Sequence, residues 1–329
     1  EAYKALPGEF EVKVVCDLEA DKAHSATTEF GVPRAVTQFS DLMTLRDEID
    51  VIDICTPPNT HRALIEQALA GGFHVICEKP VTGSLADIDA IESAAAKARG
   101  TLSPVFQYRF GNGLQKLKLL QAKGLCGTPY LATIETSWRR EADYYVMPWR
   151  GKWATELGGC CLSQAIHAHD ILSYVNGPVK RVYARVATRV NPIEVEDCAA
   201  VSVEMANGSL ATLAVTMGAT EELSRLRFMF ANMTVESRST HPYQPGNDPW
   251  HFKGRTPEID AQIATAFAEF VPSHESFAGQ LSRIHAAITG GGALPVTLAD
   301  ARGSLELITA LYHSAEAGEA VSLPIPKSH

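Results

Sequence analysis

The sequence of 329 residues lacks an apolar run of membrane-spanning length, a basic apolar leader at its start and any C-x-x-C pair. The first absence excludes a transmembrane helix. The formal net charge of −9 argues against a nucleic-acid partner, because such partners usually require a basic face. We therefore expect neither a membrane nor a nucleic acid among the partners of this protein.

The seven cysteines are scattered, and their odd number fits reduced thiols in a cytoplasm better than a disulfide framework. Cys160 and Cys161 are adjacent, which is compatible with a metal or redox site. However, neighbouring residues of a helix point in different directions, and no His/Cys spacing completes a metal site. We therefore predict that these cysteines serve packing and that the chain has no metal site.

The first hundred residues alternate strand and helix patterns, which is typical of a parallel α/β sheet. Ser84 and Asp87 have the spacing of a capping box at the start of a helix. We predict an α/β domain over residues 1–103. Its predicted strands are 11–16, 51–55 and 73–77, and its predicted helices are 61–70 and 84–98.

Beyond Pro104, strand patterns follow one another without intervening helices, which predicts a mainly antiparallel sheet. Asn207-Gly208 marks a hairpin between two of them, and Thr297 with Asp300 forms a second capping-box pattern. We predict an α+β domain over residues 104–329, with an excursion loop at 241–255. Its predicted strands are 130–138, 179–189, 199–205 and 210–217, and its predicted helices are 114–122, 156–174 and 297–315.

Two motifs far apart in the sequence contain the candidate catalytic side chains. Glu78-Lys79-Pro80 follows an apolar strand and places an ammonium group where the strand meets a loop. Far downstream, the sequence GGCCLSQAIHAHD starts at Gly158, opens a helix on glycines and sets the imidazole of His167 one turn before Asp170. A lysine and a histidine over one pocket suit removal of a proton from an alcohol while its hydride leaves.

With these two motifs in this order, nearly the whole chain resembles the Gfo/Idh/MocA oxidoreductases, the family of glucose–fructose oxidoreductase and inositol dehydrogenase. The resemblance implies a Rossmann-type dinucleotide-binding domain, followed by a domain for substrate binding and oligomerisation. It also implies an NAD(P)-dependent dehydrogenase that acts on a CH–OH group of a sugar, a sugar derivative or a cyclitol. By the same resemblance, Lys79 and His167 are the catalytic residues, and Asp170 either orients the His167 ring or serves packing or capping.

The glycine-rich turn that holds the pyrophosphate in such domains does not occur in this sequence. Asp17 instead follows the first predicted strand, in the position of the acid that accepts hydrogen bonds from the adenosine ribose. We expect that the chain as given lacks the first strand, the glycine turn and most of the helix after it, about 25 residues of a βαβ unit. The charge of Asp17 would oppose a 2′-phosphate, so we predict NAD as the cofactor in preference to NADP.

The remaining predicted cofactor contacts come from the resemblance. They lie in two loops at the carboxyl ends of strands, where ligands bind in open α/β sheets. Pro57-Pro58 has a second interpretation as ordinary turn chemistry. The predicted cofactor-binding residues are Asp17, Thr56, Pro57, Asn59, His61, Glu78 and Lys79.

The predicted substrate wall comprises Arg109 and the segment 138–153, which is rich in arginine and aromatic residues. Aromatic faces pack on sugars and arginines hold hydroxyl or carboxylate groups, so the substrates considered include an anionic sugar or a sugar acid. An alternative is a solvated or subunit-contact loop. Four residues before the histidine, inositol-dehydrogenase-like members carry an aspartate where this chain has a serine, which makes inositol a less secure substrate. The predicted substrate-binding residues are Arg109, Trp149, Arg150, Ser163, Gln164 and His167.

Two other classes of function remain open. The family includes non-catalytic, NAD-sensing regulators, although a sensor needs neither Lys79 nor His167. It also includes enzymes that use bound NAD transiently for elimination or glycoside cleavage. The antiparallel sheet is expected to pair subunits, which predicts a homodimer or homotetramer.

Overall fold

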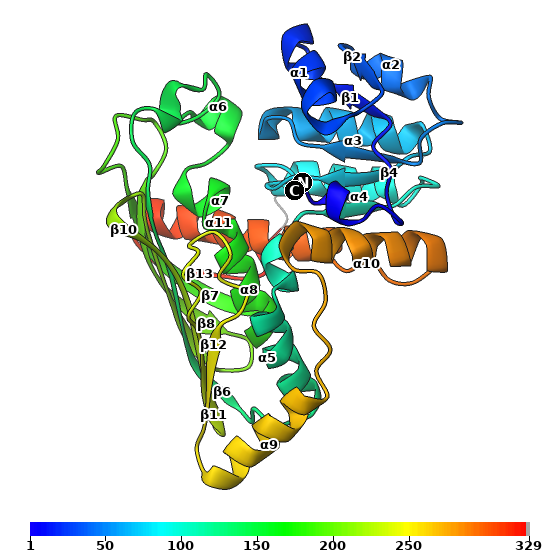
Figure 1. Cartoon of the computed structure of the whole chain (residues 1–329). Coiled ribbons are helices and arrows are strands. Elements are labelled where there is room, and N and C mark those ends of the chain that lie inside the picture. Colours follow the sequence, from blue (N-terminus) through cyan, green and yellow to red (C-terminus); the bar gives the residue numbers. More distant parts are fainter. Residues whose placement is uncertain (327–329) are drawn as a thin grey trace.

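The computed structural model describes residues 1–326 of the chain. Two bodies are visible in Figure 1, an α/β body formed by the beginning of the chain and a second body built on one large sheet. The α/β body contains residues up to about the end of strand β5 (Leu102–Pro104). The predicted fold class, a Rossmann-type parallel domain followed by an α+β domain, is confirmed.

In the first body the strands are parallel and lie in two groups. Strands β1 (Val14–Cys16) and β2 (Arg34–Val36) form one pair. Strands β3 (Val51–Ile54), β4 (His74–Cys77) and β5 form the other group. Helices follow the strands in sequence, as the alternating pattern predicts: α1 (Ala20–Phe30), α2 (Phe39–Met43), α3 (His61–Ala70) and α4 (Leu85–Ala95), with short 3-10 turns at Tyr3–Ala5 and Pro58–Thr60.

The second body is built on a sheet that, among residues 1–326, has the strand order β12-β11-β10-β6-β9-β8-β7-β13. Neighbouring strands are antiparallel except for β6 and β9, which run parallel. The Asn207-Gly208 hairpin joins β8 and β9 as predicted. The strands are β6 (Pro129–Arg139), β7 (Val179–Ala187), β8 (Cys198–Met205), β9 (Leu210–Thr216), β10 (Gly218–Phe230), β11 (Met233–Ser237), β12 (Trp250–Gly254) and β13 (Val321–Ser322).

Helices α5 (Asn112–Ala122), α8 (Ile166–Asn176) and α11 (Leu298–Ala317) lie on one side of this sheet (Figure 1). Alternate strand residues such as Ala132, Ile134 and Val203 are buried beneath them, as expected for a sheet with one covered face. Thr297 and Asp300 form the complete capping box that the sequence predicts for α11.

The helix predicted over residues 156–174 is wrong in its extent. The structure divides this segment among α6 (Trp153–Glu156), α7 (Cys160–Ser163) and α8. Leu157 adopts a left-handed conformation with φ of 69°, which ends α6. A Cβ atom on Gly159 would lie 1.9 Å from the backbone oxygen of Glu196, so this position requires glycine.

The excursion loop predicted at 241–255 is also corrected in part. Its second half forms strand β12, which pairs with β11 through residues 250–254. Trp250 is 8% exposed, and its indole N–H donates to the carbonyl of Pro245. The Pro and Gly residues of this segment predicted a loop, but its second half is a strand whose aromatic residues pack on the core.

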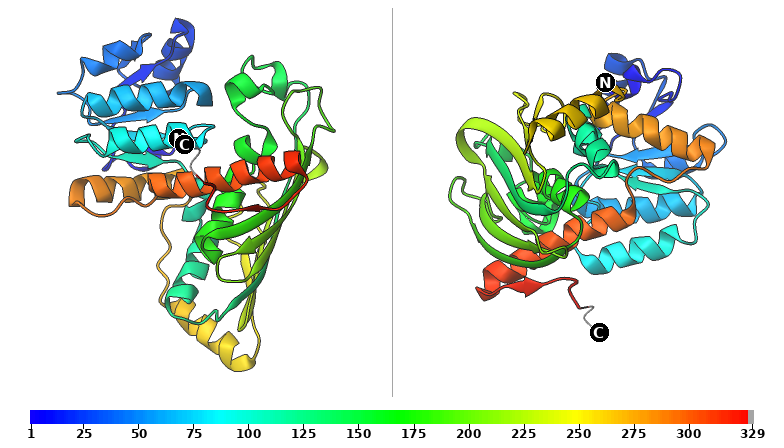
Figure 2. Two further views of the ribbon diagram at one scale, coloured as in Figure 1. Left: turned by 180° about the vertical axis from the view of Figure 1, so that it is seen from behind. Right: turned by 90° about the horizontal axis from the view of Figure 1, so that it is seen from below.

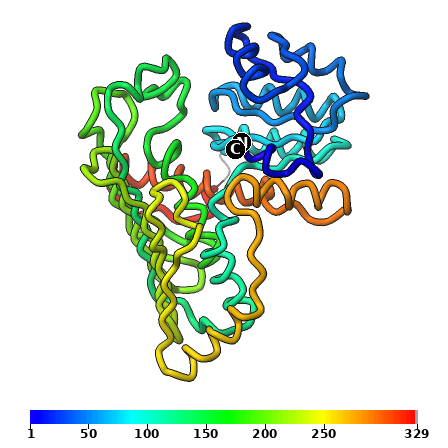
Figure 3. Tube along the Cα trace, viewed as in Figure 1, coloured from blue at the N-terminus to red at the C-terminus, as the bar shows by residue number. Residues whose placement is uncertain are grey.

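The predicted boundary at residue 103 omits a contribution from the far end of the chain. From α9 (Pro257–Ala268), the chain runs back to α10 (Ser276–Gly290) beside the first body (Figure 3). There Leu281 and Ile284 pack with Leu6, Ile76 and Val105 in a small separate core. Helices α10 and α11 together extend across both bodies (Figure 2). Within residues 1–326, no helix is long and apolar enough to cross a bilayer.

Candidate active site

Lys79 and Ser163 connect the two bodies. Lys79 follows β4, and its Nζ atom donates a hydrogen bond to the backbone carbonyl of Ser163 at the end of α7. Because an ammonium group has three N–H donors, two remain for other acceptors. The contact uses the backbone of residue 163, so the serine in place of the family aspartate does not remove it.

Charges around Lys79 act on its pKa in opposite directions. Burial lowers the pKa of the Lys79 ammonium, and the neighbouring carboxylate of Glu78 opposes this effect. The guanidinium of Arg150 lowers the pKa further, while the carboxylate of Glu156 raises it. Burial also raises the pKa of Glu78. The net lowering brings the lysine toward the range useful for proton transfer.

His167 lies at the beginning of α8 and is 4% exposed. Its ring lies against Tyr108, with the ring centroids 4.7 Å apart and the planes inclined by 30°. Phe106 contacts it edge-on, at 6.0 Å between ring centroids. Burial and the charge of Lys79 lower the pKa of His167 well below its ordinary value, so the imidazole is neutral. Among residues 1–326, its Nδ1 atom has no hydrogen-bond partner.

Asp170 does not orient the His167 ring. Both of its carboxylate oxygens accept hydrogen bonds from Arg109, at 2.7 Å from Nε and 2.6 Å from Nη2. Ser304 donates to the same carboxylate at 3.1 Å. Of the two uses that the sequence leaves open for Asp170, the structure therefore supports packing, and the His167 ring is held by Tyr108 and Phe106. The sequence did not predict the contact between His167 and Tyr108, the residue directly before Arg109.

Arg109 is bound by acidic residues of α8 and α11. It is 4% exposed, and besides Asp170 it contacts Asp300 at 3.1 Å. Its guanidinium lies over the ring of Tyr174, 4.6 Å from the centroid. These groups line a cavity of about 320 Å³ between α8, α11 and the segment at Leu323. The structure thus gives the predicted substrate residue Arg109 a place in a buried ion pair that joins segments of the second body.

Arg150, Trp149 and Gln164 gather around Tyr144. Arg150 lies over the Tyr144 ring at 4.0 Å and over the Trp149 ring at 4.2 Å, measured from its Cζ atom to each centroid. The Tyr144 hydroxyl oxygen accepts hydrogen bonds from Arg150 and from Nε2 of Gln164, the latter at 2.9 Å. Since this oxygen accepts twice, the Tyr144 proton is available to a further acceptor. Glu156 faces Arg150 at 3.6 Å between Nη1 and Oε1.

A second arginine near Lys79 is Arg140, which belongs to the segment 138–153 that the sequence assigns to the substrate wall. Arg140 donates to Glu222 at 3.0 Å and to the Tyr243 hydroxyl at 3.1 Å. Its charge lowers the pKa of Lys79, which places it within electrostatic range of the lysine. Arg140 and Arg150 each face a glutamate, so the positive charge of this wall is partly balanced from within the chain.

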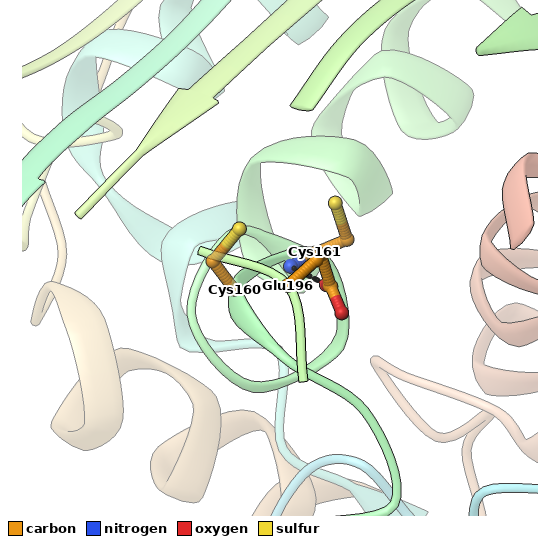
Figure 4. A group of neighbouring side chains, drawn as sticks. All are labelled: Cys160, Cys161 and Glu196. Atoms are coloured by element: carbon orange, nitrogen blue, oxygen red, sulfur yellow. Dashed lines mark hydrogen bonds between the residues drawn. The ribbon is translucent and has the colours of Figure 1, made fainter. Parts of the chain in front are cut away.

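Glu196, from the loop before β8, holds the start of α7 (Figure 4). Its carboxylate accepts from the N–H groups of Gly159 and Cys161, each at 2.9 Å, and from the Tyr312 hydroxyl at 2.9 Å. The structure differs from the expectation that the cysteines diverge, since the ligand atoms of Cys160, Cys161 and Glu196 all lie within 4.8 Å of one another. Burial raises the pKa of Cys160, and the Cys160 thiol together with burial raises that of Cys161. The Glu196 carboxylate thus holds the start of the segment that leads to His167, and both cysteines are buried beside it.

The residues expected around a dinucleotide lie after three strands, and those after β4, Glu78 and Lys79, are described above. Asp17 follows β1 and is partly exposed, and its Oδ1 atom accepts from the N–H of Glu19 at 2.8 Å. Thr56 and Asn59 are exposed in the loop after β3, with Pro57 half-buried between them. An accessible carboxylate after one strand and an accessible loop after another fit the ribose and nicotinamide parts of NAD, respectively.

His61 differs from these loop residues because it is completely buried. Its Nε2 atom lies 2.8 Å from the backbone oxygen of Thr56, and its Nδ1 atom lies 2.8 Å from that of Pro80. Both nitrogens therefore face the protein backbone, and any effect of His61 on a cofactor has to act through these two loops.

Two family models match the chain. The "oxidoreductase family, NAD-binding Rossmann fold" model matches residues 1–106, and the "GFO/IDH/MocA C-terminal domain" model matches residues 114–236. The first match covers the α/β body, and the second covers the second body from α5 to β11.

Among curated relatives, the chain is 30% identical to the uncharacterized oxidoreductase YrbE of Bacillus subtilis, over 61% of this chain and 58% of the relative. It is 29% identical to the myo-inositol 2-dehydrogenase of Thermotoga maritima, over 52% of this chain and 49% of the relative. The matched region thus spans about half the length of these curated relatives.

A solved structure covers more of the chain. The WlbA dehydrogenase of Bordetella pertussis, in complex with NADH and UDP-GlcNAcA, superposes with a TM-score of 0.85 at 26% identity. The comparison covers 99% of this chain and 94% of that protein. The two-body architecture is therefore that of a structure solved with a nicotinamide cofactor and a sugar nucleotide.

Proposed function

The chain belongs to the Gfo/Idh/MocA family of oxidoreductases, and we propose that it is an NAD-dependent dehydrogenase. The reaction transfers a hydride between a secondary alcohol of a sugar, a sugar derivative or a cyclitol and the nicotinamide ring. The observation that carries the proposal is the pairing of Lys79, bound to the carbonyl of Ser163, with the neutral imidazole of His167. A positive donor and a neutral base are the two groups that alcohol oxidation requires.

The residues present fit NAD, and when bound the nicotinamide ring supplies the hydride acceptor. Asp17 would hold the adenosine ribose through its partly exposed carboxylate. Thr56, Pro57 and Asn59 would line the nicotinamide half. Glu78 would lie beneath it, next to Lys79 at the end of β4. The negative charge of Asp17 favours NAD over NADP, because it opposes a 2′-phosphate.

Lys79 would orient the reacting alcohol. Its side chain is fixed by the bond to Ser163, so its remaining N–H donors point from a defined position. One of them would donate to the hydroxyl oxygen and stabilise the negative charge that develops as the proton leaves. In a site largely withdrawn from water, such a charged hydrogen bond is stronger than in solution.

His167 would accept the hydroxyl proton. Its lowered pKa keeps it neutral at working pH, which a general base requires. Contacts with Tyr108 and Phe106 restrict the tilt of the ring. Asp170 does not contribute to this restraint, because its carboxylate is bound to Arg109. In the reverse direction, the same imidazole in its protonated form would return the proton to the product.

The substrate would be recognised by the group around Tyr144. Its hydroxyl proton would donate to a sugar oxygen, and the accepted bonds from Gln164 and Arg150 fix its direction. The partly exposed ring of Trp149 offers a flat face for sugar C–H groups. Since Arg140 and Arg150 are each opposed by a glutamate, the site provides for a hydroxyl-rich substrate without requiring a charged one.

The first test follows nicotinamide absorbance in full-length protein with NAD and NADP against sugars, sugar acids and cyclitols, with Lys79→Ala alongside. Turnover with NAD that disappears in the variant supports the proposal. Tight NAD binding without turnover on any substrate contradicts it and favours a sensor. Product formation without net NAD reduction favours the transient use of bound NAD in elimination or glycoside cleavage.

We further propose that two copies pair through the uncovered face of the large sheet. Tyr183, Leu210 and Leu223 stand on three of its strands and are 41%, 54% and 38% exposed, respectively. Large apolar side chains on an open sheet face support an association surface. Light scattering on Tyr183→Lys/Leu210→Lys protein should report a lower mass than on the wild type, and an unchanged mass contradicts this pairing.

A further inference from the structure

His61 is buried between the two loops that flank the candidate cofactor site. It is the first residue of α3, with Thr56 in the loop before it and Pro80 in the turn after β4. Its Nε2 atom lies 2.8 Å from the Thr56 oxygen and its Nδ1 atom 2.8 Å from the Pro80 oxygen. No solvent reaches the ring, because His61 is 0% exposed. The imidazole therefore spans the space between one loop and the other.

Both groups that face the ring nitrogens are acceptors. A neutral imidazole has one N–H donor, whereas an imidazolium has two. Burial lowers the pKa of His61, and the carbonyls of Thr56, Pro80 and Val81 oppose this effect. Lys79 is the charged side chain that acts on the ring, and it favours the neutral form. In either form the ring donates to at least one loop and fills the space between both.

We propose that His61 is a positioning residue for Lys79. Pro80 directly follows Lys79, so the contact at its carbonyl fixes the main chain beside the lysine. The Ser163 carbonyl fixes the other end of the side chain at Nζ. Lys79 is thus held at both its backbone and its ammonium group, and His61 provides the backbone half of this restraint.

The same ring links Lys79 to the loop expected to line the nicotinamide. The Thr56 carbonyl is one acceptor, and the Thr56 hydroxyl is itself paired with that of Thr60 at 2.7 Å. A displacement of either loop therefore changes the distance between the lysine and the cofactor loop. A misplacement of about 1 Å is enough to lower the rate of a reaction about a hundredfold.

The direct test measures the reactivity of Lys79 toward trace acylation as a function of pH, read by mass spectrometry. It compares the wild type with His61→Ala and His61→Gln. We expect the pKa of Lys79 to rise by about one unit in His61→Ala, which is about tenfold lower reactivity at a fixed neutral pH. The loosened turn would let the ammonium group reach water, which favours its charged form. Gln keeps an N–H donor for one of the two carbonyls and should give a smaller shift.

The matched control is His74→Gln. His74 begins β4, the strand that ends before Lys79, and its ring contacts Thr101 rather than a catalytic loop. This variant should leave the Lys79 profile unchanged. The proposal is overturned if folded His61→Ala and His61→Gln proteins both show the wild-type Lys79 profile, or if His74→Gln shifts it as far as they do.

The mechanistic part of this proposal rests on the proposed dehydrogenase activity. Once a substrate has been identified, His61→Ala should lower kcat about 10- to 100-fold while the KM for NAD changes less than about threefold. A loss confined to the KM for NAD contradicts positioning and returns His61 to a cofactor contact. The acylation experiment needs no substrate, so failure of the dehydrogenase proposal and failure of the positioning proposal are seen separately.

Discussion

The ammonium group of Lys79 donates a hydrogen bond to the backbone carbonyl of Ser163, which lies 84 residues further along the chain. This bond joins the turn after β4 to the segment that carries His167. It brings the two sequence motifs together in space. It also uses an atom that every amino acid provides, so the chain can dispense with a carboxylate at position 163.

The first prediction follows from this use of the backbone. Ser163→Ala keeps the carbonyl and should change kcat by less than about threefold, whereas Lys79→Met should lower kcat about 1,000-fold or more. Lys97→Met is the matched control, because Lys97 is exposed beyond α4 and should leave kcat unchanged. Steady-state kinetics measure kcat for the three variants with the substrate identified among the sugars, sugar acids and cyclitols. A loss in Ser163→Ala comparable with that in Lys79→Met would show that the serine side chain is the essential group.

The second prediction concerns substrate recognition by Tyr144. Tyr144→Phe removes the hydroxyl that accepts from Gln164 and Arg150, and should raise the KM for the sugar about three- to tenfold. The KM for NAD should stay the same. Tyr145→Phe, one residue away, serves as the control. Equal effects in the two variants would contradict a specific role for the Tyr144 hydroxyl.

The third prediction concerns the buried ion pair of Arg109 and Asp170. Arg109→Met leaves a carboxylate buried without its partner and should lower the free energy of unfolding by about 3–5 kcal/mol. The double variant Arg109→Met/Asp170→Leu should recover most of this loss, because the buried carboxylate is then removed and the Asp300 carboxylate that remains is partly exposed. Urea unfolding measures both values. A loss below about 1 kcal/mol in the single variant would show that the pair is not a structural anchor.

The fourth prediction concerns stability in acid. His169 is completely buried, both of its ring nitrogens lack partners among residues 1–326, and burial lowers its pKa to about 4. Below about pH 6.5 the unfolded chain binds the proton first, so stability is present above this pH and falls as the pH decreases toward 4.

Replacement of His169 tests the predicted direction of this pH dependence. Between about pH 7.5 and pH 5 the wild type should lose about 2 kcal/mol more of its unfolding free energy than His169→Leu does. His24→Leu, a change at an exposed position of α1, should behave as the wild type. Identical pH dependence in all three proteins would mean that His169 contributes nothing to acid sensitivity.

The sequence predicted elements best where local chemistry alone determines them. The capping box at Thr297 and the hairpin at Asn207-Gly208 are examples, since their hydrogen bonds and backbone angles involve neighbours in the chain. The helix predicted over 156–174 failed because its interruption depends on Glu196, which approaches Gly159 from a distant loop. Periodicity does not reveal such a contact.

In the candidate site too, the residues predicted from local motifs differ from those whose position depends on distant contacts. Lys79 and His167 were predicted from motifs, and in the structure Lys79 lies within electrostatic range of His167 and donates to the carbonyl of Ser163, four residues before it. Arg109 was assigned to the substrate because arginines hold hydroxyl or carboxylate groups. Its buried partner Asp170 is 61 residues away in the chain, and the local sequence does not reveal such a contact. Tyr108 was missed for the same reason, since nothing in its local sequence indicates that it packs on His167.

The central claim is that a charged Lys79 and a neutral His167 share the proton chemistry of alcohol oxidation. The most direct measurement is the pH dependence of kcat/KM for the wild type and His167→Asn. Because the pKa values of both residues are lowered, the wild type should show an acid limb below about pH 6.5 and an alkaline limb below about pH 10.5. His167→Asn should lose the acid limb and keep the alkaline one. An acid limb that persists unchanged in His167→Asn would contradict the account.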